Sequence, residues 1–313
     1  MPIDYAHCLR QRFTENILMS LLDATSVNVV VPKIGEEADR LVADVKACQL
    51  QNARVLAVNM RFCRGSYQQF LLDLWRQYHQ QPAQECPDLS AILADLEKQP
   101  KQNFIIVLNQ LDAMCANDVD EQFDHYFYVN LNSLKNYRNV ALLVITESSS
   151  YHGLLFNIGG VFKTSKLDIQ QIEYLPALTR DEARYELSRR HPELSTVHIS
   201  HLLQQGQHRT LGYDYALLDY LSRQLSHSTQ FWDDDMASFI RQLKNWHKRY
   251  KQQSKQAEYH AKKIVEAVDK VSTIFNVKAL FKKLFLVLKV ILADPILALI
   301  ELFKDWLKKK SKD

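Results

Sequence analysis

Glycines are the residues that would let a backbone wrap around a phosphate, and this sequence has few of them. Phosphate-binding loops and dinucleotide-binding turns place glycines at fixed offsets so that backbone N–H groups can point at the anion. The 313 residues include seven glycines, and no two of them have the spacing of GxxxxGK[ST] or GxGxxG. An intact loop of either kind is therefore excluded. The seven are Gly35, Gly65, Gly153, Gly159, Gly160, Gly206 and Gly212.

The other candidate catalytic and metal-binding residues do not form a complete site in the sequence. His198 and His201 share a helix face, but no third metal ligand is near them in the sequence. The serines at 148–150 and His152 lack the strand-turn-helix context of a catalytic nucleophile. The aspartates at 233–235 fit the N-terminus of a helix better than a cation site. We expect no catalytic residue, no metal site and no cofactor.

Charge is distributed unevenly along the chain. Residues 1–236 contain 21 Lys/Arg and 29 Asp/Glu, whereas residues 237–313 contain 18 and 7, so net charges of −8 and +11 combine to +3. A basic block of this kind indicates an anionic partner, either lipid or nucleic acid. A solvated helix face is the alternative interpretation.

Composition and cysteine usage favour a folded protein with reduced thiols. Hydrophobic residues make up 47% and charged residues 24%, which excludes collagen-like, linker-like and disordered classes. The cysteines are Cys8, Cys48, Cys63, Cys86 and Cys115, and no two of them form a CxxC pair. Because the first 22 residues also lack the apolar run of a signal peptide, we expect a cytoplasmic location.

The elements that must position any site alternate between strand and helix. Such alternation is typical of an α/β domain with a mainly parallel sheet. The expected strands are 27–31, 54–60, 103–108, 140–145 and a weaker one at 172–175. The expected helices between them are about 5–22, 36–48, 66–78, 89–96 and 123–134, with Ser66 as an N-cap.

After Thr179 the pattern becomes entirely helical. Thr179 and Glu182 have the spacing of a capping box. Helices are expected at about 179–190, 196–204 and 212–226, followed by a long basic helix from about 235 to 270.

The order of these elements, and of the residues at the strand ends, resembles AAA+ ATPases over about residues 15–228. The signal-transducing (STAND) and origin-recognition-like branches are the most similar. The Walker A strand, loop and helix correspond to Val27–Val42, and the Walker B strand resembles Asn103–Asp112. The sensor-1 strand resembles Val140–Thr146. Two motifs of the lid resemble Leu175–Ala183 and Thr210–Tyr215. The resemblance implies a three-layer P-loop-type parallel sheet followed by a small helical lid domain.

The sequence departs from this family at the residues that hold nucleotide. The first glycine of the loop is replaced by Val30 or Val31, and Glu36 and Glu37 stand where lysine contacts phosphates and Ser/Thr contacts magnesium. Asn109 and Gln110 replace the Walker B carboxylates by neutral amides that do not hold a metal. We expect a pseudo-ATPase. Its degenerate site positions are Pro32, Lys33, Gly35, Glu36, Glu37, Asn109, Gln110, Asp112 and Thr146.

Three alternatives remain beside that interpretation. The chain could have another three-layer α/β fold whose strand ends only look AAA+-like. Lys33 could substitute for the missing lysine. The protein could also bind nucleotide and switch without hydrolysing it.

The C-terminal segment carries the second informative pattern. Residues 284–303 include sixteen apolar residues, interrupted by Lys289, Asp294, Pro295 and Glu301. The charges offset the apolar residues on an insertion scale, so one membrane-spanning helix is not favoured. Asp294 and Pro295 instead predict the start of a second helix, giving a pair at about 273–293 and 295–310.

Wide apolar faces and flanking lysines fit a hairpin that lies in a membrane interface. The alternative is a hairpin packed on the body of the protein or on a second copy. The residues expected to contact membrane or partner are Phe281, Lys282, Lys283, Leu284, Phe285, Leu288, Ile296, Ile300, Phe303, Trp306, Lys308, Lys309 and Lys310.

These features predict four segments and two candidate functions. The segments are an AAA+-like α/β domain at 1–178, a helical lid domain at 179–232, a basic linker helix at 233–270 and an amphipathic hairpin at 271–313. The first function is a non-hydrolysing scaffold on the cytoplasmic face of the inner membrane, in antiviral defence or signalling, with a protein partner or self-association. The second is a nucleic-acid-binding regulator of replication or transposition that uses the basic helix 241–263. In that helix Trp246 and Tyr250 interleave with Lys244, Lys248, Arg249, Lys251 and Lys255.

Overall fold

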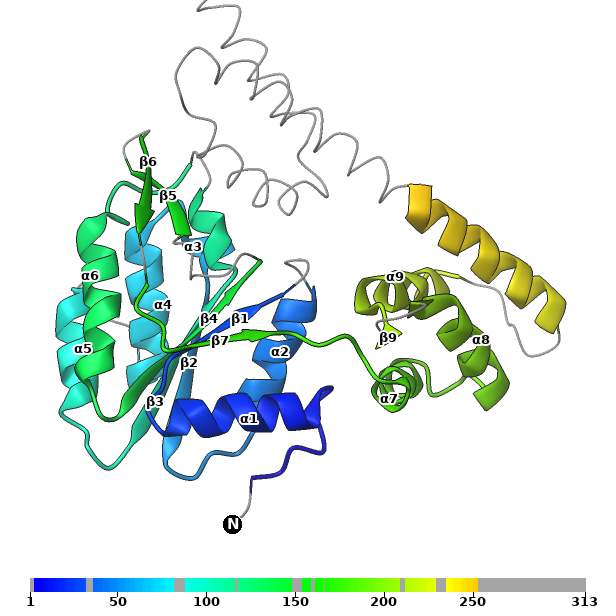
Figure 1. Cartoon of the computed structure of the whole chain (residues 1–313), viewed down its shortest axis with the longest axis horizontal. Helices are drawn as coiled ribbons and strands as arrows, with labels where there is room; N and C mark the ends of the chain where they lie inside the picture. The colour runs from blue at the N-terminus through cyan, green and yellow to red at the C-terminus, as the bar shows by residue number, and fades with distance from the viewer. Residues whose placement is uncertain are drawn as a thin grey trace, which may run out of the picture. The chain divides into compact units, whose positions relative to one another are not determined.

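One five-stranded parallel sheet lies at the centre of the first 180 or so residues (Figure 1). Its strands are β1 (Val27–Val30), β2 (Ala53–Asn59), β3 (Asn103–Asn109), β4 (Val140–Thr146) and β7 (Gln171–Tyr174), and their order across the sheet is β2-β3-β4-β1-β7. Every pairing within the sheet is parallel, with β1 between β4 and β7. The predicted α/β class with a parallel sheet is confirmed.

The structure is a computed structural model. It describes residues 3–31, 36–81, 88–115, 118–147, 154–158, 161–165, 167–208, 212–228 and 235–252. The chain divides into two compact units, Met1–Lys251 and Gln252–Asp313, and the elements described here belong to the first.

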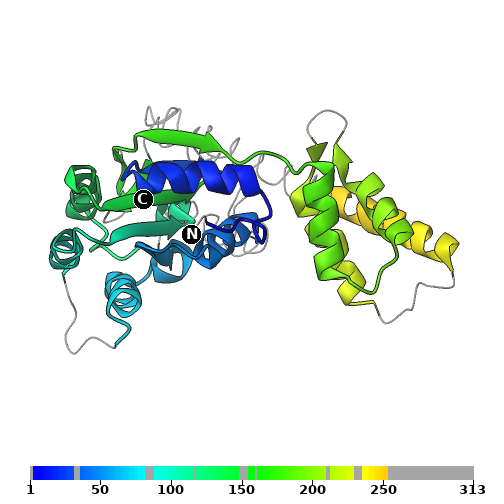
Figure 2. The ribbon, with the colours of Figure 1, turned by 90° about the horizontal axis from the view of Figure 1, so that it is seen from below.

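Helices cover both faces of the sheet because β3 and β4 are apolar on both sides. Phe104, Ile106 and Leu108 of β3 face a cluster formed with α4 (Tyr67–His79), α5 (Leu89–Glu97) and α6 (His125–Ser133). Ile105 and Val107 face the opposite cluster, formed with α1 (Gln11–Leu22) and α2 (Glu36–Ala47). The helices of the two clusters lie on opposite sides of the sheet (Figure 2). Buried parallel strands read as continuous apolar runs for this reason.

The helical part follows the sheet and has a hydrophobic cluster of its own. It comprises α7 (Arg180–Arg190), α8 (Thr196–Gly206), α9 (Tyr215–Ser226) and a helix over residues 236–252. Phe239, Leu243 and Trp246 of that last helix are buried among leucines of the other three. The short strands β8 (Gln207–His208) and β9 (Gly212–Tyr213) pair between α8 and α9.

Several predicted helix caps are confirmed. The Ser66 hydroxyl accepts a hydrogen bond from the Gln69 backbone N–H at 3.1 Å, at the start of α4. Thr179 and Glu182 form both bonds of a capping box at the start of α7. The Asp235 carboxylate accepts the Ser238 N–H at 2.9 Å, at the start of the helix 236–252. Side-chain oxygens satisfy otherwise unpaired N–H groups at all of these helix starts.

Other elements differ from the predictions. The first helix begins at Gln11 and not near Tyr5, because the Leu9 N–H is bound at 2.9 Å by the distant Asp44 carboxylate. An antiparallel hairpin of β5 (Leu154–Ile158) and β6 (Val161–Ser165) was not predicted, although two glycines between apolar runs are a hairpin signal. Also unpredicted are the short helices α3 (Met60–Cys63), η1 (Leu111–Cys115) and η2 (Leu134–Asn136).

Some predictions fall outside the described residues. These concern Pro32, Lys33 and Gly35, the segment 148–152, Asp233 and Asp234, Lys255 and the whole C-terminal hairpin with its membrane-contact residues. Within the ranges that the structure describes, no helix is both long and apolar enough to cross a membrane.

Candidate nucleotide site

Among the described residues, several of the predicted site residues lie at the carboxyl ends of the sheet strands. Asn109 ends β3, Thr146 ends β4, and Glu36 begins the helix that follows β1. β3, β4 and β1 are neighbours in the sheet. After β1 the chain continues to β2, at one edge of the sheet, whereas after β4 the next strand of this sheet is β7, at the opposite edge. Ligands of open α/β sheets bind at such a switch point, outside the carboxyl ends of the strands. The sheet thus places Asn109, Thr146 and Glu36 where a ligand site would be.

The polar groups between these strand ends bind one another. Asn28 of β1 donates its side-chain amide to the Thr146 hydroxyl at 2.8 Å and to the Val144 carbonyl at 3.1 Å. The Asp112 carboxylate accepts the Glu147 backbone N–H at 2.6 Å. Asn28, Asp112 and Thr146 are all buried. Asp112 and Thr146 therefore hold the strand ends together.

Asn109 is tied to the first turns of α2. Its side-chain amide donates to the Asp39 carboxylate at 2.6 Å. The side-chain oxygens of Asn109 and Gln110 are buried and have no hydrogen-bond partner among the described residues. Gln110 also has a φ of +58°, a left-handed conformation that is uncommon for residues other than glycine. Backbone strain and unpaired polar atoms concentrate at functional sites more often than elsewhere.

Glu36 is held by the helical part of the protein. Arg223 of α9 forms an ion pair with Glu36 and a second one with Asp219 at 2.6 Å. Burial, followed by the neighbouring Asp219 carboxyl, raises the pKa of Glu36. The first residue of α2 is thus part of a carboxylate–arginine cluster on α9.

Glu37 is held by the N-terminal segment. Arg10 forms an ion pair with Glu37, and its Nε donates to the Pro176 carbonyl at 2.8 Å. Exposed fractions of 5% and 13% for the two side chains make this a buried pair. Because Pro176 precedes α7, Arg10 joins the start of the chain, α2 and the entry into the helical part.

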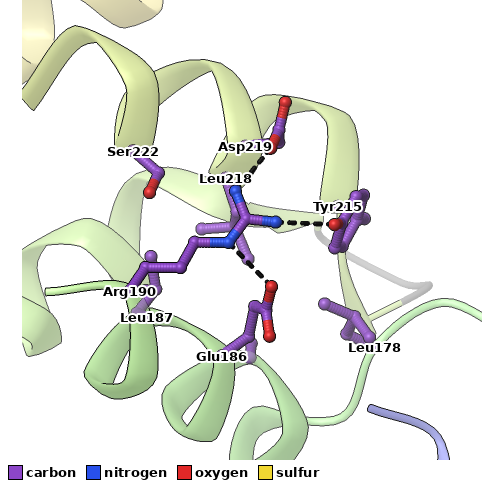
Figure 3. A pocket seen from close by; sticks show the side chains of 9 residues that line it. Leu178, Glu186, Leu187, Arg190, Tyr215, Leu218, Asp219 and Ser222 are labelled. Carbon is purple, nitrogen blue, oxygen red and sulfur yellow. Dashed lines mark hydrogen bonds and ion pairs between the residues drawn. The ribbon is translucent and has the colours of Figure 1, made fainter. Parts of the chain in front are cut away.

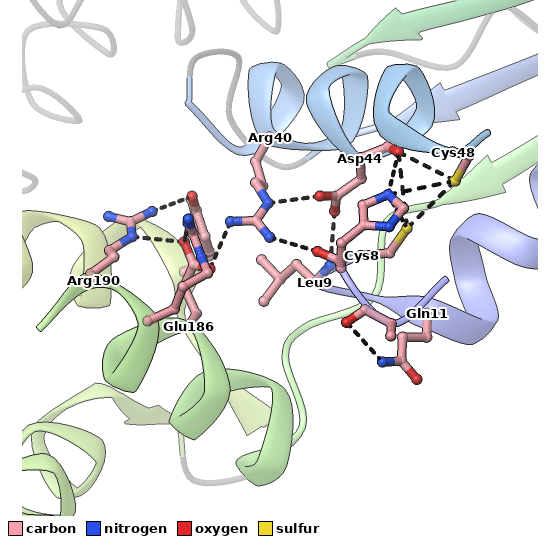
Figure 4. A network of polar contacts seen from close by, with 12 residues as sticks. Cys8, Leu9, Gln11, Arg40, Asp44, Cys48, Glu186 and Arg190 are labelled. Carbon is pink, nitrogen blue, oxygen red and sulfur yellow. Dashed lines mark hydrogen bonds and ion pairs between the residues drawn. The ribbon is translucent and has the colours of Figure 1, made fainter. Parts of the chain in front are cut away.

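Arg40, on α2, forms two further ion pairs. Arg40 contacts Asp44 at 2.8 Å and Glu186 of α7 at 2.7 Å (Figure 4). Burial favours the protonated form of Glu186, but Arg189, Arg190 and Arg40 outweigh burial and hold its pKa below the usual value. Glu36, Glu37 and Arg40 of α2 therefore each pair with a group outside that helix.

A small pocket in the helical part is centred on Arg190 (Figure 3). Its guanidinium contacts Glu186 at 2.7 Å, the Tyr215 hydroxyl at 2.6 Å, and Asp219. Burial raises the pKa of Tyr215 to about 12. Since two carboxylates already neutralise Arg190, the pocket offers little positive charge to an anion.

Several exposed basic residues lie on the helix 236–252. Lys244, Lys248, Arg249 and Lys251 are exposed, and none forms an ion pair with another described residue. Trp246 is buried in the core of the helical part, and Tyr250 packs against Tyr220 with ring centroids 5.3 Å apart. The expectation that Trp246 interleaves with the charges on one surface is therefore wrong, because the Trp246 ring faces the opposite, apolar side.

His198 and His201 form no site in the described residues. His198 is buried, with its ring edge-on to Phe239 and its Nδ1 2.6 Å from the Ser195 hydroxyl. That contact belongs to the cap of α8.

The charged residues of the ion-pair network around α2, α7 and α9 were not predicted. They are Arg10, Arg40, Glu186, Arg190, Asp219 and Arg223. The pairs Arg40–Asp44, Glu186–Arg190 and Asp219–Arg223 have the i,i+4 spacing of ion pairs on one helix face, and that spacing is visible in the sequence. The contacts Arg223–Glu36 and Arg10–Glu37 have no local signal.

Comparisons with known proteins find similarity to solved structures, at low sequence identity. No family model matches the sequence, and no curated protein is detectably similar to it. Among solved structures it is similar to Drosophila ORC bound to DNA (13% identity, 69% of this chain, 56% of that chain, TM-score 0.42). It is also similar to Cdc6p from Pyrobaculum aerophilum (12%, 72%, 63%, 0.44) and to a Walker-type ATPase of Pyrococcus abyssi (7%, 86%, 77%, 0.44).

The chain spans less than two thirds of the length of the first two of these structures. At these identities and TM-scores the similarity concerns the fold and carries no information about function.

Proposed function

We propose that the chain is a non-hydrolysing AAA+-like protein, a pseudo-ATPase, that acts by binding other macromolecules. One observation carries the proposal: Glu36 and Glu37, at the positions where this family has the phosphate lysine and the magnesium Ser/Thr, are ion-paired with Arg223 and Arg10. The order of strands, helices and strand-end residues supports the family resemblance.

The electrostatics of this arrangement disfavour a magnesium–triphosphate. Two carboxylates would face the phosphates in place of a lysine and a hydroxyl, and their negative charges would repel those of the phosphates. Moving them away would separate Arg223 and Arg10 from their partners. Asn109, which would have to hold the metal, is a neutral amide already bound to Asp39.

A phosphate-release assay tests the absence of hydrolysis. The full chain is incubated with Mg-ATP alone, with duplex DNA, and with anionic vesicles, since partners stimulate many ATPases. We expect no release above the protein-free background in any arm. Turnover that disappears in an Asn109→Ala variant would contradict the proposal, because it would assign the activity to this site.

We further propose that the C-terminal hairpin brings the protein to the cytoplasmic face of a membrane, where it serves in signalling or defence. Support comes from the sequence of residues 271–313, with sixteen apolar residues in the window 284–303 and lysines on both sides. Co-sedimentation with vesicles compares the full chain with a chain ending at residue 270. Phosphatidylglycerol vesicles should pellet only the full chain, and equal behaviour of the two chains would exclude the hairpin as the anchor.

A nucleic-acid-binding regulator is the second candidate function. The exposed side chains of Lys244, Lys248, Arg249 and Lys251 on the helix 236–252 favour it. The apolar side of this helix is buried, so its charged side faces outward from a rigid support. Basic side chains held in this way contact phosphates regardless of base sequence.

A further inference from the structure

A histidine and two cysteines converge between the N-terminal segment and the end of α2. The sulfur atoms of Cys8 and Cys48 lie 3.7 Å apart. The Nε2 atom of His7 lies 3.4 Å from the Cys8 sulfur and 3.7 Å from the Cys48 sulfur. Both cysteine side chains are buried and His7 is half-buried. The three atoms form a nearly equilateral triangle of donors.

These separations match the edges of a tetrahedral zinc site. With Zn–S bonds of about 2.3 Å and Zn–N bonds of about 2.0–2.1 Å, neighbouring ligand atoms in a tetrahedron lie about 3.5–3.8 Å apart. A disulfide requires the two sulfurs to lie about 2.05 Å apart and gives no role to the histidine. Thiolate and imidazole are also the ligand types that zinc prefers.

A backbone oxygen lies at the fourth corner. The Asp44 carbonyl oxygen is 3.1 Å from His7 Nε2, 3.3 Å from the Cys48 sulfur and 4.0 Å from the Cys8 sulfur. No other group of three potential ligands of this kind was found among the described residues. A metal inside the triangle would therefore have this oxygen, or a water near it, as its fourth neighbour.

Surrounding hydrogen bonds fix the ligands in place (Figure 4). The Asp44 carboxylate accepts the Leu9 backbone N–H at 2.9 Å and also pairs with Arg40. Arg40 in turn donates to the His7 carbonyl at 3.2 Å. Groups that orient metal ligands in this way contribute strongly to metal affinity.

We propose that His7, Cys8 and Cys48 bind one Zn²⁺ ion, with the Asp44 carbonyl oxygen at the fourth position. The ion fastens the N-terminal segment to the end of α2. Arg10 follows Cys8 by two residues and pairs with Glu37 at the other end of the same helix, so the ion also helps to place Arg10. This site lies away from the strand ends and does not depend on the proposed loss of hydrolysis.

Metal analysis of the full chain tests the proposal. Reduced protein is purified without chelator or added metal, and its zinc is measured by mass spectrometry. We expect one zinc per chain, lost in Cys8→Ser and Cys48→Ser. The matched control is Cys63→Ser, which changes a buried thiol that contacts Asp73 at 3.6 Å and should keep its zinc.

Cobalt provides a second readout that does not require the serine variants to fold. Replacing zinc by Co²⁺ in the wild-type chain should give the visible bands of a tetrahedral site and a thiolate-to-cobalt charge-transfer band. His7→Ala should weaken or shift these bands. The proposal is overturned if the wild-type chain binds neither zinc nor cobalt, if Cys8→Ser keeps its zinc, or if Cys8 and Cys48 are found disulfide-linked in protein kept under reductant.

Discussion

Arg223 of α9 forms an ion pair with Glu36, the first residue of α2. The contact joins the helical part directly to the helix that follows β1, at the position where the family resemblance expects a phosphate-binding lysine. An arginine so placed could face an anion, but here it is shared by Glu36 and Asp219. The helical part and α2 thus satisfy each other's charges without a ligand.

The buried pair Arg10–Glu37 should contribute far more to stability than an exposed pair. Glu37→Ala leaves the Arg10 guanidinium buried without its counter-ion, which costs about 3 kcal/mol. The control is Asp118→Ala, which removes the partner of Arg64 at an exposed pair and should cost less than about 1 kcal/mol. Urea unfolding measures both free energies. Equal costs would show that the Glu37 carboxylate is not held as described.

Acid should weaken the fold partly through Glu186. Its pKa is lowered in the folded protein, so the unfolded chain takes up the proton first as the pH falls. The stabilising contribution is complete above the unfolded pKa of about 4.3 and is lost as the pH falls through the lower folded pKa. Glu186→Gln should therefore be less stable at neutral pH and should lose less stability on acidification.

Melting temperatures measured at a series of pH values check this, with exposed Glu97→Gln as the control. The control should follow the wild-type profile. A Glu186→Gln profile parallel to the wild type would contradict the assignment.

Gly212 should tolerate no side chain. Its φ is +92°, and a Cβ atom there would lie 2.6 Å from the Leu178 carbonyl oxygen. Gly212→Ala should destabilise the protein by about 1–3 kcal/mol because of this strain and contact. Gly65→Ala is the matched control, since its Cβ would meet only the Asp118 carbonyl oxygen at 3.7 Å. Thermal unfolding distinguishes them, and an unaffected Gly212→Ala would disprove the strain.

If the protein binds DNA, the helix 236–252 should provide the phosphate contacts. A triple alanine variant at Lys244, Lys248 and Arg249 should bind duplex DNA more weakly. The slope of its log binding constant against log salt concentration should be less steep by about three. The control removes three exposed lysines elsewhere, Lys46, Lys98 and Lys101. Fluorescence anisotropy at several salt concentrations gives the slopes. If the control variant bound DNA as weakly as the triple alanine variant, DNA binding would not be localised to this helix.

The sequence predicted the sheet well and the contacts around the strand ends poorly. Each parallel strand was predicted to within one residue at either end, because strands buried on both faces are continuous apolar runs. The strand ends at Asn109 and Thr146 followed directly. Helix caps at Ser66 and Thr179 were found because capping is a local interaction.

Contacts between distant residues had no such signal. Arg10 lies 27 residues from Glu37, and Cys8 lies 40 residues from Cys48. Only the fold brings these side chains together, so neither charge nor cysteine spacing revealed the ion pairs or the histidine–cysteine cluster. The prediction that Trp246 lies on the charged surface of the helix 236–252 was wrong for a related reason. The sequence does not show which side of a single helix is buried.

Titration of Mg-ATP into the full chain, followed by thermal unfolding, tests the central claim most directly. A ligand that binds only the folded state raises its stability in proportion to the logarithm of its concentration above Kd. With Glu36 and Glu37 paired to Arg223 and Arg10, the melting temperature should stay constant up to millimolar Mg-ATP. A saturable rise of several degrees, abolished by changing Asn109 to alanine, would contradict the account.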